Sequence, residues 1–149
     1  MSFKQAVYAH CLVLLEDKIK SLRAILSELE EGSHSDSKSS AGDKHETARA
    51  MMQLEQEKIG KQLQEAMAQR AGLEKTGVAA PSAEIRKGSL VKTSQGYLFL
   101  SISIGKINVS GTAVMVISSQ SPLALKLQGL APGSQAHING ISYTIEHVE

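Results

Sequence analysis

The feature that most constrains the fold is an uninterrupted apolar repeat near the N-terminus. Residues 3–31 contain neither glycine nor proline, and their apolar side chains are spaced alternately by four and three residues. This seam comprises Tyr8, Leu12, Leu15, Ile19, Leu22, Leu26 and Leu29. Because an α-helix turns once every ~3.6 residues, the spacing places the seam on one helix face. The segment is therefore predicted to form one long helix of the coiled-coil type.

A second helix is predicted from about Asp43 to about Lys75, after a loop of small polar residues at 32–42. Its apolar seam is less regular, because Gln56 and Arg70 interrupt it. The apolar members of this seam are Met52, Ile59, Leu63, Ala66 and Leu73. Neither helix would be stable alone, so we expect the two to pair as an antiparallel two-helix coiled coil.

The sequence pattern changes in the last part of the chain, where strand signals appear. Alternating residues at 98–104 and a β-branched run at 112–118 predict two strands. The Asn-Gly pair within 137–143 predicts a hairpin with a type I′ turn, because Asn and Gly accept positive φ angles. Residues 121–129 begin with Ser-Pro and end with Gly, which is the capping pattern of a short helix. We therefore expect a small antiparallel sheet with one short helix.

Together these signals predict an α+β protein with two parts. The coiled-coil hairpin is expected to occupy residues 1–75, with its tip near residues 32–46. Residues 76–84 contain both glycine and proline and are predicted to be a linker. The sheet domain is expected to occupy residues 85–149.

Composition and motifs exclude several function classes. The net charge is +1, so the chain lacks the broad basic field of a nucleic-acid-binding protein. The apolar run at 11–15 is too short to span a membrane and has no signal-peptide cleavage pattern, so we expect a cytoplasmic protein without membrane contact. We interpret Cys11, the single cysteine, as a buried packing residue. Neither a phosphate loop nor a Gly-x-Ser-x-Gly motif is present, so the chain is not expected to be an enzyme by itself.

The order of segments in the C-terminal part resembles the bacterial Gre transcript-cleavage factors. Over about residues 85–148, a Ser-Pro-Leu helix, a glycine, a hairpin and a Tyr-x-Ile sequence follow one another. The matching stretches are residues 86–91, 116–124, 127–130 and 143–145. The resemblance implies an FKBP-like C-terminal domain that docks on RNA polymerase. It makes Ser121, Pro122 and Leu123 the candidate contact residues for that docking.

The tip of the predicted hairpin carries the second part of the resemblance. Residues 42–47 read Gly-Asp-Lys-His-Glu-Thr, which is similar to the family's tip motif Gly-Asp-Leu-x-Glu-Asn. The resemblance implies that the coiled coil enters the secondary channel of RNA polymerase and approaches the nascent RNA. Asp43 and Glu46 then help to hold a second Mg²⁺ in the polymerase's own active site, where water cuts a backtracked transcript. The chain itself would bind no cofactor alone, and we expect it to be a monomer.

Three alternatives stay open on the residues alone. Asp43 and Glu46 also have the i, i+3 spacing of a capping box, which is a purely structural role. Lys44 and Thr47 replace the Leu and Asn of the family motif, which is compatible with a polymerase modulator that does not promote cleavage. A coiled-coil adaptor that binds another protein is the third alternative.

Two charged clusters on the first helix bear on the partner. The three glutamates within 28–31 lie near the predicted helix end, where the helix dipole disfavours acids. A broken local rule of this kind favours a functional acidic tip, although a solvated hairpin end is the simpler interpretation. Lys18, Lys20 and Arg23 form a basic cluster that could contact polymerase acids or RNA, or could simply be a solvated face.

Overall fold

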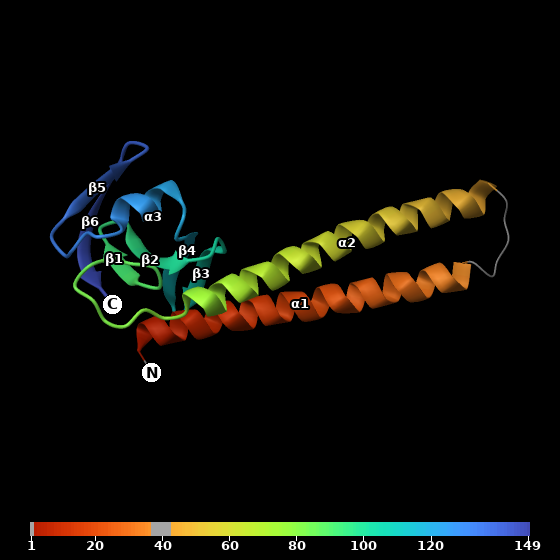
Figure 1. Cartoon of the computed structure of the whole chain (residues 1–149), viewed down its shortest axis with the longest axis horizontal. Helices are drawn as coiled ribbons and strands as arrows, with labels where there is room; N and C mark the ends of the chain where they lie inside the picture. Colours follow the sequence, from red (N-terminus) through yellow and green to blue (C-terminus); the bar gives the residue numbers. More distant parts are fainter. Residues whose placement is uncertain (1, 37–42) are drawn as a thin grey trace. The chain divides into compact units, whose positions relative to one another are not determined.

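The chain has an α+β fold in which two long helices precede a six-stranded sheet and one short helix (Figure 1). The computed structural model describes the backbone of residues 2–36 and 43–149, and the side chains of residues 2–32 and 46–149. The elements are α1 (Phe3–Asp36), α2 (Asp43–Thr76), β1 (Leu90–Thr93), β2 (Gly96–Ser101), β3 (Gly105–Val109), β4 (Thr112–Ser118), α3 (Pro122–Leu127), β5 (Gln135–Ile138) and β6 (Ile141–Val148). The expected fold class is confirmed.

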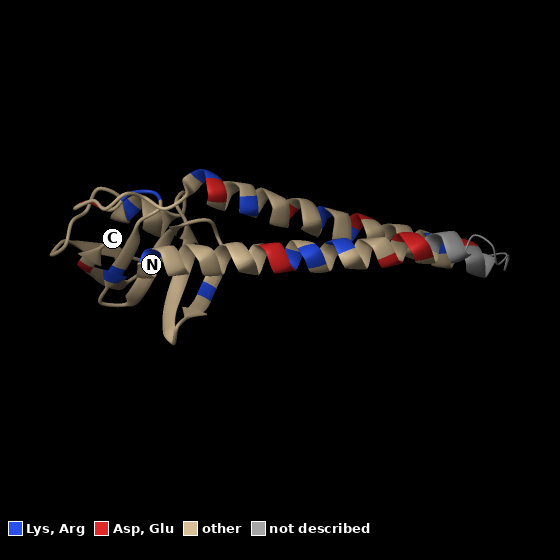
Figure 2. Cartoon of the chain, turned by 90° about the horizontal axis from the view of Figure 1, so that it is seen from below, with Lys and Arg blue, Asp and Glu red and all other residues tan. Residues whose placement is uncertain are grey.

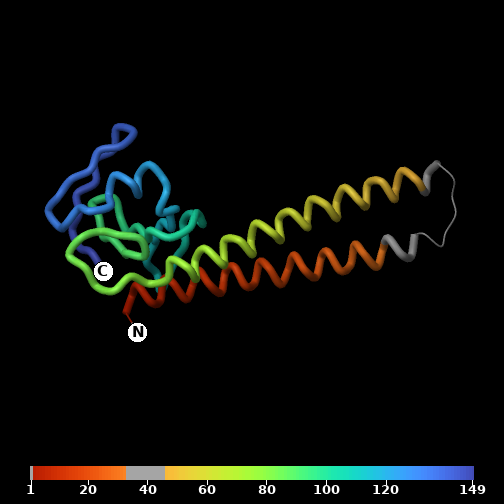
Figure 3. The backbone as a smooth tube through the Cα atoms, in the orientation of Figure 1, coloured from red at the N-terminus to blue at the C-terminus, as the bar shows by residue number. Residues whose placement is uncertain are grey.

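Two compact units make up the structure, and both long helices contribute to each of them. The helical unit comprises Leu14–Arg70, and the sheet unit comprises Met1–Val13 together with Ala71–Glu149. The backbone trace in Figure 3 shows that α1 and α2 are continuous helices up to the segment that connects them. The start of α1 and the end of α2 therefore belong to the same unit as the strands.

In the helical unit, α1 and α2 pack along the predicted seam. Its buried core consists of Ile19, Leu22, Ile59 and Ala66, with Leu26, Leu29 and Leu63 packed against it. Leu15 is also buried. The predicted pairing of the two helices is thus confirmed, and the Leu and Ile positions of the seam provide its contacts.

The two polar residues that interrupt the seam of α2, Gln56 and Arg70, both have interaction partners on α1. The Nε2 atom of Gln56 donates a hydrogen bond to the carbonyl oxygen of Leu29 at 3.1 Å. The Nη2 atom of Arg70 lies 3.2 Å from Oε1 of Glu16, and both side chains are about two-fifths exposed. An exposed ion pair of this kind contributes roughly 0.2–1 kcal/mol to the free energy of unfolding, so it adds little to the stability of the helix pair.

The first helix is longer than the sequence predicts. The polar loop was expected to begin at position 32, but α1 continues to Asp36. A glycine inside a helix costs only about 1 kcal/mol relative to alanine, so Gly32 does not end α1 by itself. A Cβ atom at Gly32 would lie 2.7 Å from Cε of Met52, so the glycine also allows close approach to α2.

The six strands follow the order β3-β4-β2-β1-β6-β5. All neighbouring pairs are antiparallel except β2 and β4, which are parallel. The sheet is thus mostly antiparallel, as expected, with one parallel pair. The parallel pair arises because the β3–β4 hairpin places β4, rather than β3, beside β2.

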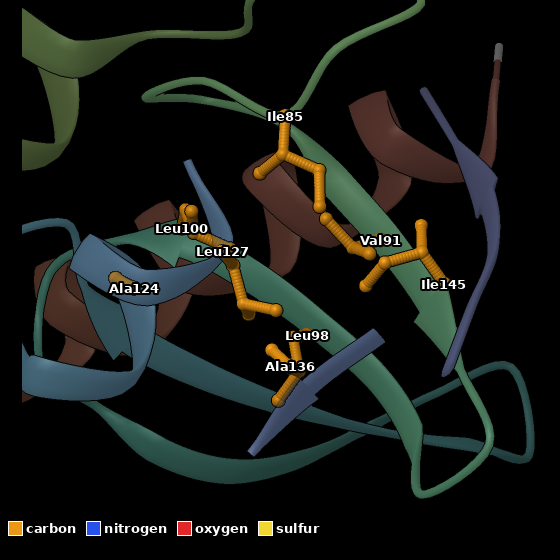
Figure 4. Packing of buried hydrophobic residues seen from close by; sticks show 8 residues of the cluster. All are labelled: Ile85, Val91, Leu98, Leu100, Ala124, Leu127, Ala136 and Ile145. Carbon is orange, nitrogen blue, oxygen red and sulfur yellow. The ribbon is translucent and has the colours of Figure 1, made fainter. Parts of the chain in front are cut away.

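One face of the sheet carries a cluster of buried apolar side chains. Val91, Leu98 and Ile145 contribute to it from β1, β2 and β6, and α3 covers it with Ala124 and Leu127 (Figure 4). The rest of the buried cluster consists of Ile85, Leu100 and Ala136. Leu98 and Leu100 of the predicted run at 98–104 lie on this face, but β2 ends at Ser101, so Ile102 and Ile104 lie outside the strand.

The opposite face of the sheet is buried as well. Phe99 is fully buried and is flanked on its own face by Leu90 of β1 and Val116 of β4, its direct partners in the two ladders. Tyr97 shares that face and packs edge-on against Phe3 of α1, with ring centroids 5.2 Å apart. The first turns of α1 therefore cover this second face.

The buried side of α1 is shifted at its N-terminal end. Val7 and Cys11 are completely buried, whereas the predicted seam residues Tyr8 and Leu12 are only half-buried. Phe3, Val7 and Cys11 are spaced by four residues and so lie on one helix side. The buried side of α1 in the sheet unit thus differs from the predicted seam.

The local signals around α3 and the last hairpin are confirmed. Ser121 is the N-cap of α3, and its Oγ accepts a hydrogen bond from the Ala124 backbone N–H at 3.2 Å. Asn139 and Gly140 both have positive φ angles, 51° and 77°, as the type I′ turn between β5 and β6 requires.

Replacing Ser121 with alanine is expected to lower the free energy of unfolding by about 1 kcal/mol, because the cap of α3 is lost. Urea unfolding of the whole chain, followed by circular dichroism, measures the change. Ser121→Asp is the matched control, since aspartate is an equally good N-cap. Equal stability of the alanine variant and the unaltered chain would contradict a stabilising cap.

Candidate functional site

The predicted tip acids lie at the beginning of α2. Asp43 is the first residue of α2, and Glu46 lies one turn later with an exposed side chain. The preceding residues 37–42 and the side chain of Asp43 lie outside the described part of the structure. Side chains at i and i+3 of a helix are neighbours, so the backbone is compatible both with a capping box and with two carboxylates that share one ligand.

The acidic cluster at 28–31 does not lie at the end of α1, where the sequence analysis expected it. Glu28, Glu30 and Glu31 are exposed, but α1 runs on to Asp36. The helix dipole acts mainly within the last turn, so its effect on these three acids is weaker than the sequence suggests. The helix dipole therefore gives no support for a functional acidic tip. The three glutamates are explained by their place on a solvated face of α1.

The predicted basic cluster is exposed but does not form one patch. Lys18, Lys20 and Arg23 all have exposed side chains on α1. Figure 2 shows blue lysine and arginine segments along the long helices. Successive helical residues are about 100° apart, so Lys20 and Arg23 share a side of α1 while Lys18 points elsewhere. The Nη2 atom of Arg23 also lies 4.0 Å from the sulfur of Met67 on α2.

Helix α3 divides its apolar residues between the core and the surface. Leu127 is fully buried, Leu123 packs against the edge of the core cluster, and Leu125 is 56% exposed. Of the candidate contact residues, Pro122 is exposed and Ser121 is half-buried while capping the helix. Any surface that α3 offers to a partner therefore includes Pro122 and Leu125, and the sequence alone did not distinguish Leu125 from its buried neighbours.

Cys11 has the environment of a packing residue, as the sequence suggests. Its side chain is fully buried, and this burial raises the pKa of the thiol to about 11. The thiolate is the reactive form of cysteine, so the folded chain holds almost none of it at neutral pH.

Thiol–disulfide exchange of Cys11 in the folded chain at pH 8 is expected to be roughly 100-fold slower than in urea, because the raised pKa depletes the thiolate. A chromogenic disulfide reagent measures both rates. The same pKa shift favours the folded state fully below pH 9 and progressively less as the pH rises toward 11. Equal rates in the two solvents would contradict the buried position.

A further residue of interest, which its sequence context does not single out, is the buried Lys4. Its side chain is 5% exposed, and its Nζ donates a hydrogen bond to the carbonyl oxygen of Ala79 at 2.6 Å. Burial lowers the pKa of Lys4, while the nearby Glu149 opposes this effect and Arg86 adds to it. The sequence signal that could have identified Lys4 is its spacing. Lys4 lies four residues before Tyr8, so a charged residue occupies a position of the four-three repeat that continues through Cys11 and Leu15.

Lys4 lines a groove of about 590 Å³ in the sheet unit. Its walls are the first turn of α1, residues 78–81 and the last residues of β6. The wall at 78–81 is fixed by Lys4 and by Arg86, whose Nη2 donates to the carbonyl oxygen of Ala80 at 2.7 Å. Gly88, with φ +84°, lies against the same segment, where a Cβ atom would come within 2.8 Å of the Ala79 nitrogen.

Within the described residues, no three His, Cys, Asp or Glu side chains come together as a metal site. None of the described helices is long and apolar enough to cross a membrane. No protein-family model, curated protein or solved structure matches this chain.

Proposed function

We propose that this protein is a Gre-like accessory factor of RNA polymerase that stimulates cleavage of backtracked transcripts. The observation that carries the proposal is the combination of a paired helical hairpin and an α+β sheet unit in one chain, with Asp43 and Glu46 in the first turn after the hairpin loop. The sheet unit would dock on the polymerase through α3, and the hairpin tip would enter the secondary channel.

The chemistry of the tip supports this role. Mg²⁺ is commonly held by one or two carboxylates together with phosphate oxygens and water. Asp43 and Glu46 supply two carboxylates one helical turn apart, so the remaining ligands would come from the polymerase and the RNA. The metal, when bound there, activates water for attack on the transcript. The two acids of this chain would hold and orient it.

A second candidate function keeps the fold and the partner but lacks the cleavage step. Lys44 and Thr47 stand where the family motif has Leu and Asn, so the immediate neighbours of the two acids differ. A factor of this kind would enter the channel and alter initiation or substrate entry. The same tip would then act by its shape and charge.

The test uses purified RNA polymerase halted in a backtracked complex with end-labelled RNA and Mg²⁺. Under the proposal, addition of the whole protein shortens the transcript within minutes, and the shortened RNA can be extended again. Inhibition of the polymerase without shortening supports the modulator. Absence of any binding to polymerase contradicts both functions and favours an adaptor that binds another protein.

A further inference from the structure

The groove beside Lys4 borders a part of β6 whose main chain is unpaired on one side. Strand β5 pairs with β6 only as far as Thr144, and the following residue, Ile145, bonds to Gly133 and Ser134. Beyond Ile145, the described hydrogen bonds of β6 run only to β1. The last residues of β6 therefore form a short free edge at the groove.

The register of the ladder shows which atoms face this free edge. Leu90 and Glu149 exchange both backbone hydrogen bonds, at 3.1 and 2.8 Å, so they form a hydrogen-bonded pair. The adjacent pair, Val91 and Val148, is then of the non-hydrogen-bonded type. The N–H and C=O of Val148 consequently point away from β1, toward the edge that β5 does not cover.

Lys4 gives the same groove a cationic group. An ammonium group has three N–H donors, and the described hydrogen bonds of Lys4 use one of them, to Ala79. Glu149, which also lines the groove, and Arg86 both lie close enough to influence the Lys4 ammonium, but none of the described ion pairs joins Lys4 to a carboxylate. The walls around it include the apolar side chains of Val78, Pro81 and Val148.

From these observations we propose that the groove binds the C-terminal end of an extended peptide. The peptide would add a short strand to the free edge of β6 through Val148, and its terminal carboxylate would accept hydrogen bonds from Lys4. Added strands obtain affinity from main-chain hydrogen bonds and specificity from neighbouring pockets. A terminal carboxylate suits this site because it lies in line with the strand and is compact enough to reach a buried ammonium group. A groove of this volume is within the range of ligand pockets, roughly 300–1,000 Å³.

The test is an NMR titration of the isotope-labelled whole chain with the hexapeptide Thr-Val-Thr-Val-Thr-Val. Its β-branched residues favour an extended conformation. Saturable shifts are expected in the backbone amides of residues 78–80 and 146–149 and in the first turn of α1. The same peptide with a C-terminal amide is expected to bind roughly tenfold more weakly, because the carboxylate that Lys4 recognises is absent.

Two variants test the two kinds of contact separately. Val148→Pro removes an N–H that does not pair with β1, so the fold is retained while peptide affinity falls by roughly tenfold or more. Lys4→Met is expected to weaken binding of the free-acid peptide to the level of the amide. Lys106→Met, which removes an exposed lysine on β3, is the matched control and leaves affinity unchanged. The NMR spectra themselves report whether each variant is folded.

Three outcomes of the peptide titrations would overturn the proposal, and a fourth comes from acetate. These are the absence of saturable shifts at millimolar peptide, equal affinity of the acid and amide peptides, and unchanged affinity of folded Val148→Pro. Acetate alone reproducing the full set of shifts would also overturn it, because the groove would then bind a small anion without strand addition. The titration uses the protein alone, so its result does not depend on the proposed role at RNA polymerase.

Discussion

Replacing Phe99 with alanine is expected to lower the free energy of unfolding by about 3–5 kcal/mol, the usual cost of removing a buried phenyl ring. Phe99 is completely buried at the centre of the sheet, between Leu90 and Val116 on neighbouring strands. The cavity would open on the face that the first turns of α1 cover. Urea unfolding of the whole chain by circular dichroism gives the free energy, and residual structure in the helices appears as a second transition.

Matched substitutions show whether this cost comes from packing. Phe99→Leu keeps most of the apolar volume and is expected to cost about 1–2 kcal/mol. Leu125→Ala, at a 56% exposed position on α3, is expected to cost less than about 1 kcal/mol. If Phe99→Ala cost no more than Leu125→Ala, the second face of the sheet would not be tightly packed.

Replacing Asp43 with asparagine is expected to slow transcript cleavage in the polymerase complex by about 100-fold, which corresponds to roughly 2.7 kcal/mol of transition-state stabilisation. The substitution removes the charge needed for Mg²⁺ but keeps the size of the side chain. Asparagine is also as good an N-cap as aspartate, so the start of α2 should remain intact. Glu46→Gln likewise removes a charge but keeps the capping ability, because glutamine also serves in a capping box.

The outcome of these substitutions separates the metal from the capping interpretation. Glu55→Gln, at an exposed position further along α2, is the matched control and is expected to cleave normally. Binding of each variant to polymerase, measured by competition with the unaltered protein, shows whether docking is retained. Full cleavage activity in both Asp43→Asn and Glu46→Gln would assign the two acids a structural role only.

Features that depend on neighbouring residues could be predicted from the sequence. The heptad spacing from Leu15 to Leu29 predicted the pairing side of α1, and Ser121 predicted the cap of α3. The Asn139–Gly140 turn followed from its φ requirement. In each case the physical cause acts over a few residues or one helical repeat, so no tertiary information was needed.

Features that depend on distant segments could not be predicted. Val7 and Cys11 are more deeply buried than Tyr8 and Leu12, and the turns of α1 that carry them belong to the same compact unit as the strands, which are distant in the sequence. The parallel pairing of β2 with β4 is likewise a consequence of topology. At the candidate sites, sequence spacing identified the acids of α2, whereas the groove at Lys4 exists only after residues 78–81 and the end of β6 come together.

The inclusion of Met1–Val13 in the sheet unit has a consequence for synthesis of the protein. The first turns of α1 are synthesised before the strands that belong to the same unit. Contacts between segments so far apart in sequence form slowly, since a long loop must close before they add stability. The sheet unit therefore completes its folding only after the hairpin has been made, and until then an apolar side of α1 has no strands to pack against.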